Sequence, residues 1–426
     1  MNARWIAVVT VLLTVTGLLV VGGVPRAMAE PGALTFSASP VSAAAAKEGE
    51  PYTIGFCAAI TGPSSSLGLP ERNTAQMLQE QFADGIIGPD GVHHELKIII
   101  YDTESNPDTA ASVANRLITE DEVDVLVCGT TSGNSMAMMP IASENEVPMI
   151  SMASARAIIE DPETGETRKW IFKTAQENQH SGEWQAVYLD AIGVKTACDL
   201  YENTGYGQDC LAQTKKALEA KGIELAYIDT FDGGDTEFPQ LTGVQTSGCE
   251  VLVVGAIPPG ASTVTVAAVE ALPNIPVIQG HGVCNQAYID LAGDAAEDVV
   301  FPCGRLMIAD LLPDTDPQKA VLLKYTEDYT KFTGGEQIST FGGHAYDSIL
   351  MVVEALSTLN EGMPLAERRA AIRDYLETSI VNWPGVSGVF DMAPDNHMGL
   401  AYDDMTFVKV EDGTWAYYPP EEWQQP

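Results

Sequence analysis

The chain has 426 residues, with 22 Lys and Arg against 59 Asp and Glu, and a formal net charge of −37 at pH 7. This charge excludes nucleic-acid binding, in which Lys and Arg neutralise phosphates, and attachment to an anionic membrane surface. With 45% hydrophobic residues, the chain is too apolar for intrinsic disorder. Its length predicts two or three globular domains.

The first thirty residues have the pattern of a secretory signal peptide. Arg4 supplies a positive start, residues 5–24 are apolar apart from Thr and Gly, and Ala27-Met28-Ala29 forms an A-x-A cleavage site. The alternative is a transmembrane anchor, which the cleavage site and the polar region after it disfavour. We therefore expect residues 1–29 to be removed, which leaves a net charge of −39, and residues 30–50 to form a flexible leader. No Cys stands at the cleavage point, so a lipid anchor is not expected.

Seven cysteines stand at positions 57, 128, 198, 210, 249, 284 and 303. Export permits disulfides, and the odd number leaves at least one free thiol. The absence of C-x-x-C argues against a thioredoxin-type redox site or a zinc ribbon. Cys284 and Cys303 flank one short helical segment and are the preferred disulfide candidate. Cys57 and Cys128 lie in strands that are possible neighbours, or are simply buried small apolar residues.

From residue 52 onward, strands and helices alternate. We expect strands at 52–60, 96–101, 123–127, 148–151, 196–201, 225–230, 251–255, 276–279 and 299–302. We expect helices at 69–82, from 107, from 134, and at 181–192, 206–221, 318–332 and 346–359, before a less regular C-terminal end. Repeated βα units predict parallel sheets covered by helices on both faces, and two consecutive sets predict two doubly wound α/β lobes. Ligands in such folds bind beyond the carboxyl ends of the strands.

Two of the loops at those strand ends are rich in small and hydroxyl residues. Residues 129–135 (GTTSGNS) lead into a helix, whose first-turn N–H groups suit a carboxylate. Residues 151–155 (SMASA) allow the backbone to approach a ligand closely. Ordinary N-capping by Ser or Asn explains the same residues without a ligand, so the pattern alone leaves both interpretations open.

Known catalytic and cofactor motifs are absent from the sequence. Residues 129–133 do not form the nucleophile elbow G-x-S-x-G, and 93–95 (HHE) do not form H-E-x-x-H. The G-x-G pairs at 205–207 and 280–282 lack the third glycine of a dinucleotide fingerprint, and the six His do not cluster at metal-ligand spacing. We therefore predict a binding protein rather than an enzyme, with no cofactor and no metal.

Several motifs occur in an order that resembles one known family. They are 52–55 (YTIG), 61–63 (TGP), 129–135 (GTTSGNS), 147–151 (VPMIS), Tyr201 with 206–207 (YG), 280–282 (GHG) and 345–347 (AYD). Together they resemble the leucine/isoleucine/valine-binding proteins, exported type I substrate-binding proteins of ABC transporters, over about 51–410. The resemblance implies two doubly wound parallel-sheet lobes joined by a hinge. It places lobe one at 51–175 with 305–383, and lobe two at 176–304 with 384–426.

The resemblance also implies a function. The protein would be the periplasmic solute-binding component of an ABC importer, a monomer that closes over a small molecule and presents it to a membrane permease. The alternative is a ligand-sensing binding protein that presents its ligand to a receptor.

The family's ligand contacts carry over to specific positions. Its carboxylate-binding serine falls at Ser135, its next contacts at Ala153 and Ala155, its aromatic contact at Tyr206, and its acidic residue at about His281. The remaining candidates are the loop hydroxyl and the expected pocket walls: Ser132, Leu67, Ile257 and Phe341.

Two of these positions depart from the family pattern. Ala155 replaces a usual threonine, and His281 replaces the carboxylate that meets a ligand ammonium. A clamp for a zwitterion is therefore incomplete. We predict a ligand with one carboxylate and an apolar or aromatic remainder, with a branched-chain amino acid as the alternative.

Overall fold

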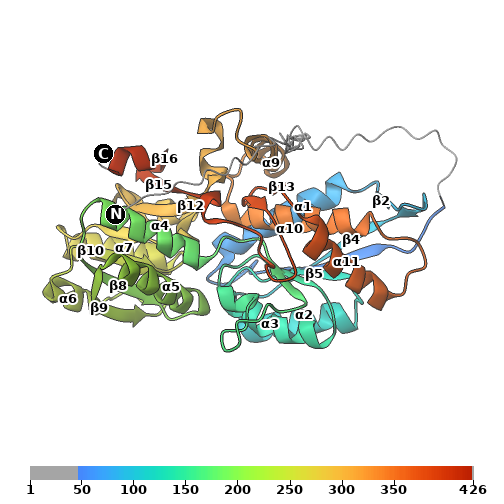
Figure 1. Ribbon diagram of the computed structural model, residues 1–426, viewed down its shortest axis with the longest axis horizontal. Helices are drawn as coiled ribbons and strands as arrows, with labels where there is room; N and C mark the ends of the chain where they lie inside the picture. The colour runs from blue at the N-terminus through green and yellow to red at the C-terminus, as the bar shows by residue number, and fades with distance from the viewer. Residues whose placement is uncertain (1–46, 425–426) are drawn as a thin grey trace, which may run out of the picture. The chain divides into compact units, whose positions relative to one another are not determined.

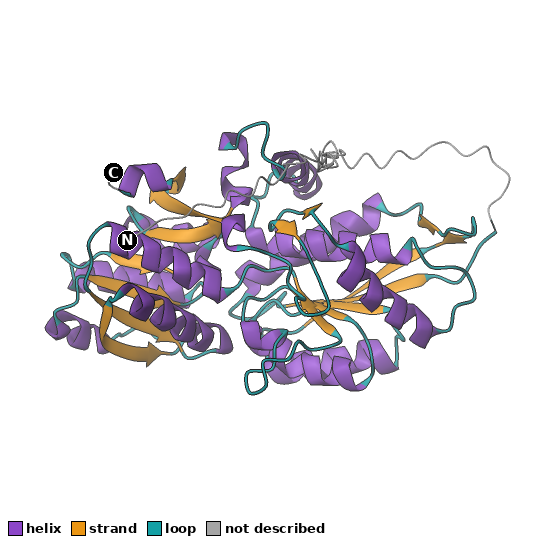
Figure 2. Ribbon diagram, in the orientation of Figure 1, coloured by secondary structure: helices purple, strands orange, loops and turns teal. Residues whose placement is uncertain are grey.

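The computed structural model describes residues 47–424 and contains two mainly parallel sheets, each with its own helices (Figures 1 and 2). We call the part around the five-stranded sheet the first lobe and the part around the seven-stranded sheet the second lobe. This arrangement confirms the α/β fold class expected from the sequence. The predicted signal peptide and residues 30–46 of the predicted leader lie outside the described residues.

The first lobe has the strand order β4-β1-β5-β6-β7, with all neighbours parallel. Its strands are β1 (Tyr52–Ala58), β4 (Leu96–Asp102), β5 (Val125–Cys128), β6 (Met149–Ser151) and β7 (Ile171–Lys173). Its helices are α1 (Ser65–Gln81), α2 (Pro107–Thr119), α3 (Ser132–Glu144), α9 (Lys319–Thr333), α10 (Thr340–Leu356) and α11 (Leu365–Ser379). Helix α1 packs on α10 over one face of the sheet, and α2 packs on α3 over the other (Figure 1).

The second lobe has the strand order β16-β15-β12-β11-β10-β8-β9. Its strands are β8 (Thr196–Glu202), β9 (Glu224–Phe231), β10 (Val251–Gly255), β11 (Val277–Gln279), β12 (Val300–Gly304), β15 (Met405–Glu411) and β16 (Thr414–Tyr417). Its helices are α4 (Asn178–Ala191), α5 (Gly205–Lys221), α6 (Gln240–Ser247), α7 (Gly260–Ala271), α8 (Gln286–Ala292) and α12 (Pro420–Trp423). Helix α4 packs on α5, and α7 packs on α8.

The central strands are apolar on both faces because helices cover both sides of each sheet. Every residue of β5 (VLVC) and of β10 (VLVVG) is buried, as expected for parallel strands between two helical layers. The helix signals in the sequence also act as expected. Asn106 caps α2 by accepting hydrogen bonds from the N–H groups of Asp108 and Thr109, and Pro107 is the first helical residue.

Some elements were not expected from the sequence. Strands β15 and β16 add an antiparallel edge to the second sheet, and β7 and α11 lie in segments to which we had assigned no element. Residues 47–50, which we had placed in the leader, contact the first lobe, because Glu48 forms a bridge with His93. Among the described residues, no helix has the length and apolar character needed to cross a membrane.

Six of the cysteines form three disulfides. The pairs are Cys57 with Cys128, Cys198 with Cys249, and Cys284 with Cys303. The first joins β1 to β5, and the third is the pair preferred from the sequence. Cys210 remains a free thiol, and it is buried.

The chain crosses between the two sheets three times, and the crossings meet at Ser387. Gln176, on the first crossing, donates a hydrogen bond from Nε2 to the Ser387 carbonyl at 2.5 Å. Gly304, on the second, leaves room for this amide, since a Cβ there would lie 2.7 Å from Gln176 Nε2. The Ser387 hydroxyl bonds His344 Nδ1 at 2.9 Å, and the Ser387 N–H donates to Asp347 at 2.7 Å. The first and third crossings are therefore held together by a buried hydrogen bond, and the second packs closely against them at Gly304.

A buried ion pair fastens α11 to the first sheet. Arg368 Nε lies 2.6 Å from a carboxylate oxygen of Asp124, whose side chain is 1% exposed. The other Asp124 oxygen accepts the Thr53 N–H at 2.7 Å. Removing one member leaves a buried charge without a partner, which costs far more than an exposed ion pair contributes.

We expect Asp124→Ala to lower the free energy of unfolding by about 3 kcal/mol, measured by urea denaturation. The matched control is Arg116→Ala, which removes an exposed pair with Glu120 on α2 and is expected to cost less than about 1 kcal/mol. The double variant with Arg368→Met is expected to recover part of the loss. Equal losses in Asp124→Ala and Arg116→Ala would contradict this account.

Candidate functional site

A narrow cavity lies where the carboxyl ends of the parallel strands of the two sheets meet. Its walls come from loops after β5, β6, β7, β10, β11 and β12, and from the first turns of α1, α5 and α10. The lining residues are Leu67, Thr130, Thr131, Ser132, Ala153, Ser154, Gln176, Tyr206, Ile257, His281, Gly282, Cys284, Gly304, Thr340, Phe341 and His344. This is the place where ligands bind in parallel α/β folds.

Most of the residues singled out in the sequence come together in this lining. They are Leu67, Ser132, Ala153, Tyr206, Ile257, His281 and Phe341. Ser135 and Ala155 lie outside it.

Ser135 faces into the protein rather than the cavity. Its hydroxyl bonds the Gly129 and Thr131 carbonyls and the Ser151 hydroxyl, the last at 2.8 Å. Ser132 stands one helical turn earlier and presents its hydroxyl at the cavity wall, where it accepts the Ala155 N–H at 3.3 Å. Ser132, rather than the predicted Ser135, is therefore the serine of this loop that lines the cavity, and the backbone of Ala155 bonds it.

The lining also contains residues that the sequence analysis did not single out. Ser154 stands between the two alanines carried over from the family, and Thr130 and Thr131 belong to the hydroxyl-rich loop already noted. Thr340 and His344 occupy the first turns of α10, which begins six residues before the expected start. For Gln176 and Gly304, the only sequence signal is their place beside the expected lobe boundaries.

An apolar wall occupies one side of the cavity. Leu67, Tyr206, Cys210, Ile257 and Phe341 form one cluster of buried side chains. The Tyr206 hydroxyl accepts the Gly282 N–H at 2.7 Å. Burial raises the pKa of Tyr206, so the phenol stays neutral and fixes the loop after β11.

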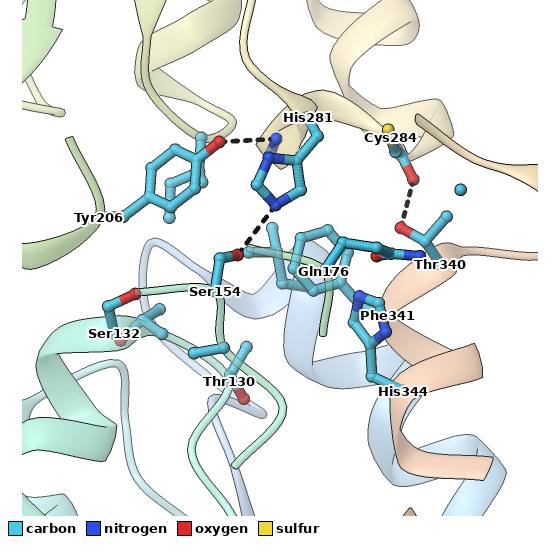
Figure 3. A pocket seen from close by; sticks show the side chains of 16 residues that line it. Thr130, Ser132, Ser154, Gln176, Tyr206, His281, Cys284, Thr340, Phe341 and His344 are labelled. Atoms are coloured by element: carbon cyan, nitrogen blue, oxygen red, sulfur yellow. Dashed lines mark hydrogen bonds between the residues drawn. The ribbon is translucent and has the colours of Figure 1, made fainter. Parts of the chain in front are cut away.

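His281 reaches across the cavity from the second lobe to the first. Its Nε2 lies 3.1 Å from the Ser154 hydroxyl (Figure 3). Burial, reinforced by the charge of Lys173, lowers the His281 pKa to about 3, so the ring is neutral at pH 7. A second contact between the lobes joins the Thr340 hydroxyl to the Cys284 carbonyl at 3.0 Å (Figure 3).

His344 is also neutral, because burial lowers its pKa to about 3. With both histidines neutral, no lining side chain among the described residues carries a formal charge. Glu71 lies directly behind the wall, where it accepts a hydrogen bond from the Thr130 hydroxyl, and burial raises its pKa well above the usual range. The Thr130 hydroxyl in turn accepts the Ala59 N–H at 2.8 Å.

The N-terminus of α3 lies at the wall of this uncharged cavity, where Thr131 and Ser132 belong to the lining. Thr131 caps the helix by accepting the Asn134 N–H at 3.3 Å. The N–H groups of Ser132 and Gly133 have no acceptor among the described residues. Free N–H groups at a helix N-terminus, with the helix dipole behind them, attract anions. No group of three or more metal-ligating side chains is assembled in the described part of the chain.

Comparison with known proteins places these features in a family. The model of the periplasmic binding protein family matches residues 51–414. A leucine-, isoleucine-, valine-, threonine- and alanine-binding protein of Pseudomonas aeruginosa is 24% identical over 77% of this chain and 84% of its own.

Two solved structures have the same fold. An extracellular ligand-binding receptor from Rhodopseudomonas palustris HaA2 superposes with a TM-score of 0.78 and 26% identity, over 87% of this chain and 99% of its own. A solute-binding protein of an ABC transporter from Rhodopseudomonas palustris BisB5, solved in complex with 3,4-dihydroxybenzoic acid, superposes with a TM-score of 0.69 and 20% identity, over 86% of this chain and 95% of its own.

We expect Tyr206→Phe to lower the free energy of unfolding by about 2 kcal/mol without any ligand, because the buried Gly282 N–H loses its acceptor. Tyr101→Phe is the matched control, since that hydroxyl bonds Asp121 at the surface, and its effect is expected within about 0.5 kcal/mol. Urea denaturation of both variants provides the measurement. A Tyr206→Phe variant as stable as the control would show that the Gly282 N–H finds another acceptor.

Proposed function

Because this chain belongs to the periplasmic binding protein family, we propose that it is the periplasmic solute-binding component of an ABC importer. It captures a small carboxylate-bearing molecule between its two lobes and delivers it to a membrane permease. One observation carries the choice of ligand: the described residues that line the cavity include several hydrogen-bond donors but no acidic side chain.

The carboxylate binds at the N-terminus of α3. The hydroxyls of Thr131 and Ser132, which line the cavity, and the free N–H group of Ser132 offer donors on one wall. A carboxylate that accepts several such hydrogen bonds is stabilised without a cationic side chain. The cavity therefore suits a single anionic group.

An α-amino acid is the less favourable ligand for this cavity. Its ammonium would enter a space without a carboxylate among the described lining residues, next to the neutral imidazole of His281. A buried unpaired charge costs several kcal/mol. The apolar wall of Leu67, Ile257 and Phe341 accommodates an aliphatic or aromatic body instead. The 3,4-dihydroxybenzoic acid held by one structural relative belongs to this ligand class, whereas the name of the Pseudomonas relative points to amino acids.

Capture proceeds by closure of the two lobes. A ligand that touches Ser132 on the first lobe and Tyr206 on the second favours the closed state through its differential affinity. The hydrogen bonds of His281 with Ser154 and of Thr340 with Cys284 join the two lobes in the closed state. The three crossings that meet at Ser387 act as the hinge, and the protein works as a monomer.

A thermal-shift panel tests this function. Benzoate, 3,4-dihydroxybenzoate and 4-methylpentanoate are compared with leucine, valine and the uncharged amides of the first and third acids. A true ligand at one hundred times its Kd stabilises the folded state by about 2.7 kcal/mol, which raises the Tm by several degrees. We expect carboxylates to give the largest shifts. A shift with leucine or valine alone would overturn the ligand class and leave a branched-chain amino acid binder.

A further inference from the structure

A lysine is buried directly behind the cavity wall. Lys173 is the last residue of β7, and its side chain is fully buried. Its ammonium donates a hydrogen bond to the Ser154 carbonyl at 2.5 Å. Among the described residues, no Asp or Glu oxygen lies within 4.0 Å of Nζ, which is unusual for a buried lysine.

The nearby acids are already engaged elsewhere. Glu177 lies 3.2 Å from Arg156 and 3.5 Å from His180, and Asp209 accepts a hydrogen bond from Asn178 at 2.6 Å. Glu177 and Asp209 still attract the ammonium from a distance, whereas Arg156 repels it. Among the described residues, Lys173 therefore has no carboxylate in direct contact.

Ser154 connects this charge to the cavity. The same residue holds Lys173 through its carbonyl, lines the cavity, and bonds His281 through its hydroxyl. The charge of Lys173 contributes to the lowered pKa of both lining histidines, His281 and His344. Its field thus reaches two separate walls of the cavity.

We propose that Lys173 is a specificity-determining residue that selects anionic ligands through the cavity wall, without touching them. The inference rests on the proposed function and deepens it. The bound carboxylate supplies the negative charge near Lys173 that no side chain in contact with the lysine provides. A neutral or zwitterionic ligand gains little from this charge, and an ammonium group is repelled by it.

The first test compares wild type with Lys173→Met by isothermal titration calorimetry at pH 7. The probes are benzoate with benzamide, and 4-methylpentanoate with 4-methylpentanamide, because each pair differs mainly in charge. We expect Lys173→Met to weaken carboxylate binding by about tenfold to a hundredfold, because it removes a positive charge that lies behind the wall of a site from which water is partly excluded. The affinity of the variant for each amide is expected to stay within about twofold of the wild-type value. The control Lys169→Met removes an exposed lysine four residues earlier, which lies over the Trp170 ring, and is expected to leave both unchanged.

The second test uses the pH dependence of wild type, which does not depend on the folding of a variant. Burial lowers the Lys173 pKa from 10.5 to about 8. Carboxylate affinity is therefore expected to hold below pH 8 and to fall between pH 8 and 10, while amide affinity stays level. The charged groups around Lys173 are Glu177, Asp209 and Arg156, with the neutral His281 and His344 beyond Ser154.

Stability is expected to change in the opposite direction over the same interval. Between pH 8 and 10.5 the unfolded chain keeps the Lys173 proton and the folded chain releases it. The unfolded state then binds more protons, so unfolding free energy rises with pH, an increment that Lys173→Met lacks. This opposition between binding and stability distinguishes a charge effect from simple loss of structure.

The outcomes separate the two proposals. Equal weakening of carboxylate and amide in Lys173→Met would make Lys173 a structural support for Ser154 and overturn the inference, while the proposed function stands. A flat carboxylate affinity between pH 8 and 10 would overturn it as well. If wild type binds leucine and none of the carboxylates, the proposed ligand class is wrong and the inference falls with it.

Discussion

The structure depends on the junction at Ser387, where buried hydrogen bonds join the first and third crossings between the lobes and the second packs against them at Gly304. Gln176 reaches the Ser387 carbonyl at 2.5 Å, and His344 reaches its hydroxyl at 2.9 Å. Both Gln176 and His344 also line the cavity. Two residues that bond Ser387 therefore also form part of the cavity wall, so the junction between the crossings and the cavity share side chains. Buried polar groups of this kind tolerate few alternative arrangements, because each lost partner is costly.

Local sequence signals predict the elements of the fold well, but not every strand of the sheets. The apolar runs at β5 and β10 and the Asn106-Pro107 helix start act over a few residues, and the structure agrees with them. Strands β15 and β16 were not expected, because their place depends on pairing with β12, about one hundred residues earlier in the chain. Such pairing is decided by tertiary contacts, which override local preference. Short β7 is likewise defined by its neighbour β6.

At the candidate site, too, some features follow from local sequence and others depend on tertiary packing. The position of the loops follows from strand polarity, which drew attention to the loop of Ser132, whereas Tyr206 and His281 were singled out by the family resemblance; all three line the cavity. The direction of each side chain does not follow, because Ser132 and Ser135 are one helical turn apart and both precede the same apolar stretch. Only the packed structure shows that the Ser135 hydroxyl is hydrogen-bonded to the Ser151 hydroxyl and turned away from the cavity. Nothing in the sequence marked Lys173 as a buried residue near the site, since a lysine at a strand end ordinarily lies at the surface.

The strong acidity of the chain and an anionic ligand are compatible because the two act at different distances. The net charge of −37 is a property of the whole chain, and salt screens exposed charges beyond about 8 Å at physiological ionic strength. Lys173 and the N–H groups of α3 lie in or behind the cavity wall, away from solvent, where screening is weak. A single unneutralised ammonium there outweighs distant surface carboxylates. The acidity thus governs the outer surface, whereas a few buried groups dominate the electrostatic potential inside the cavity.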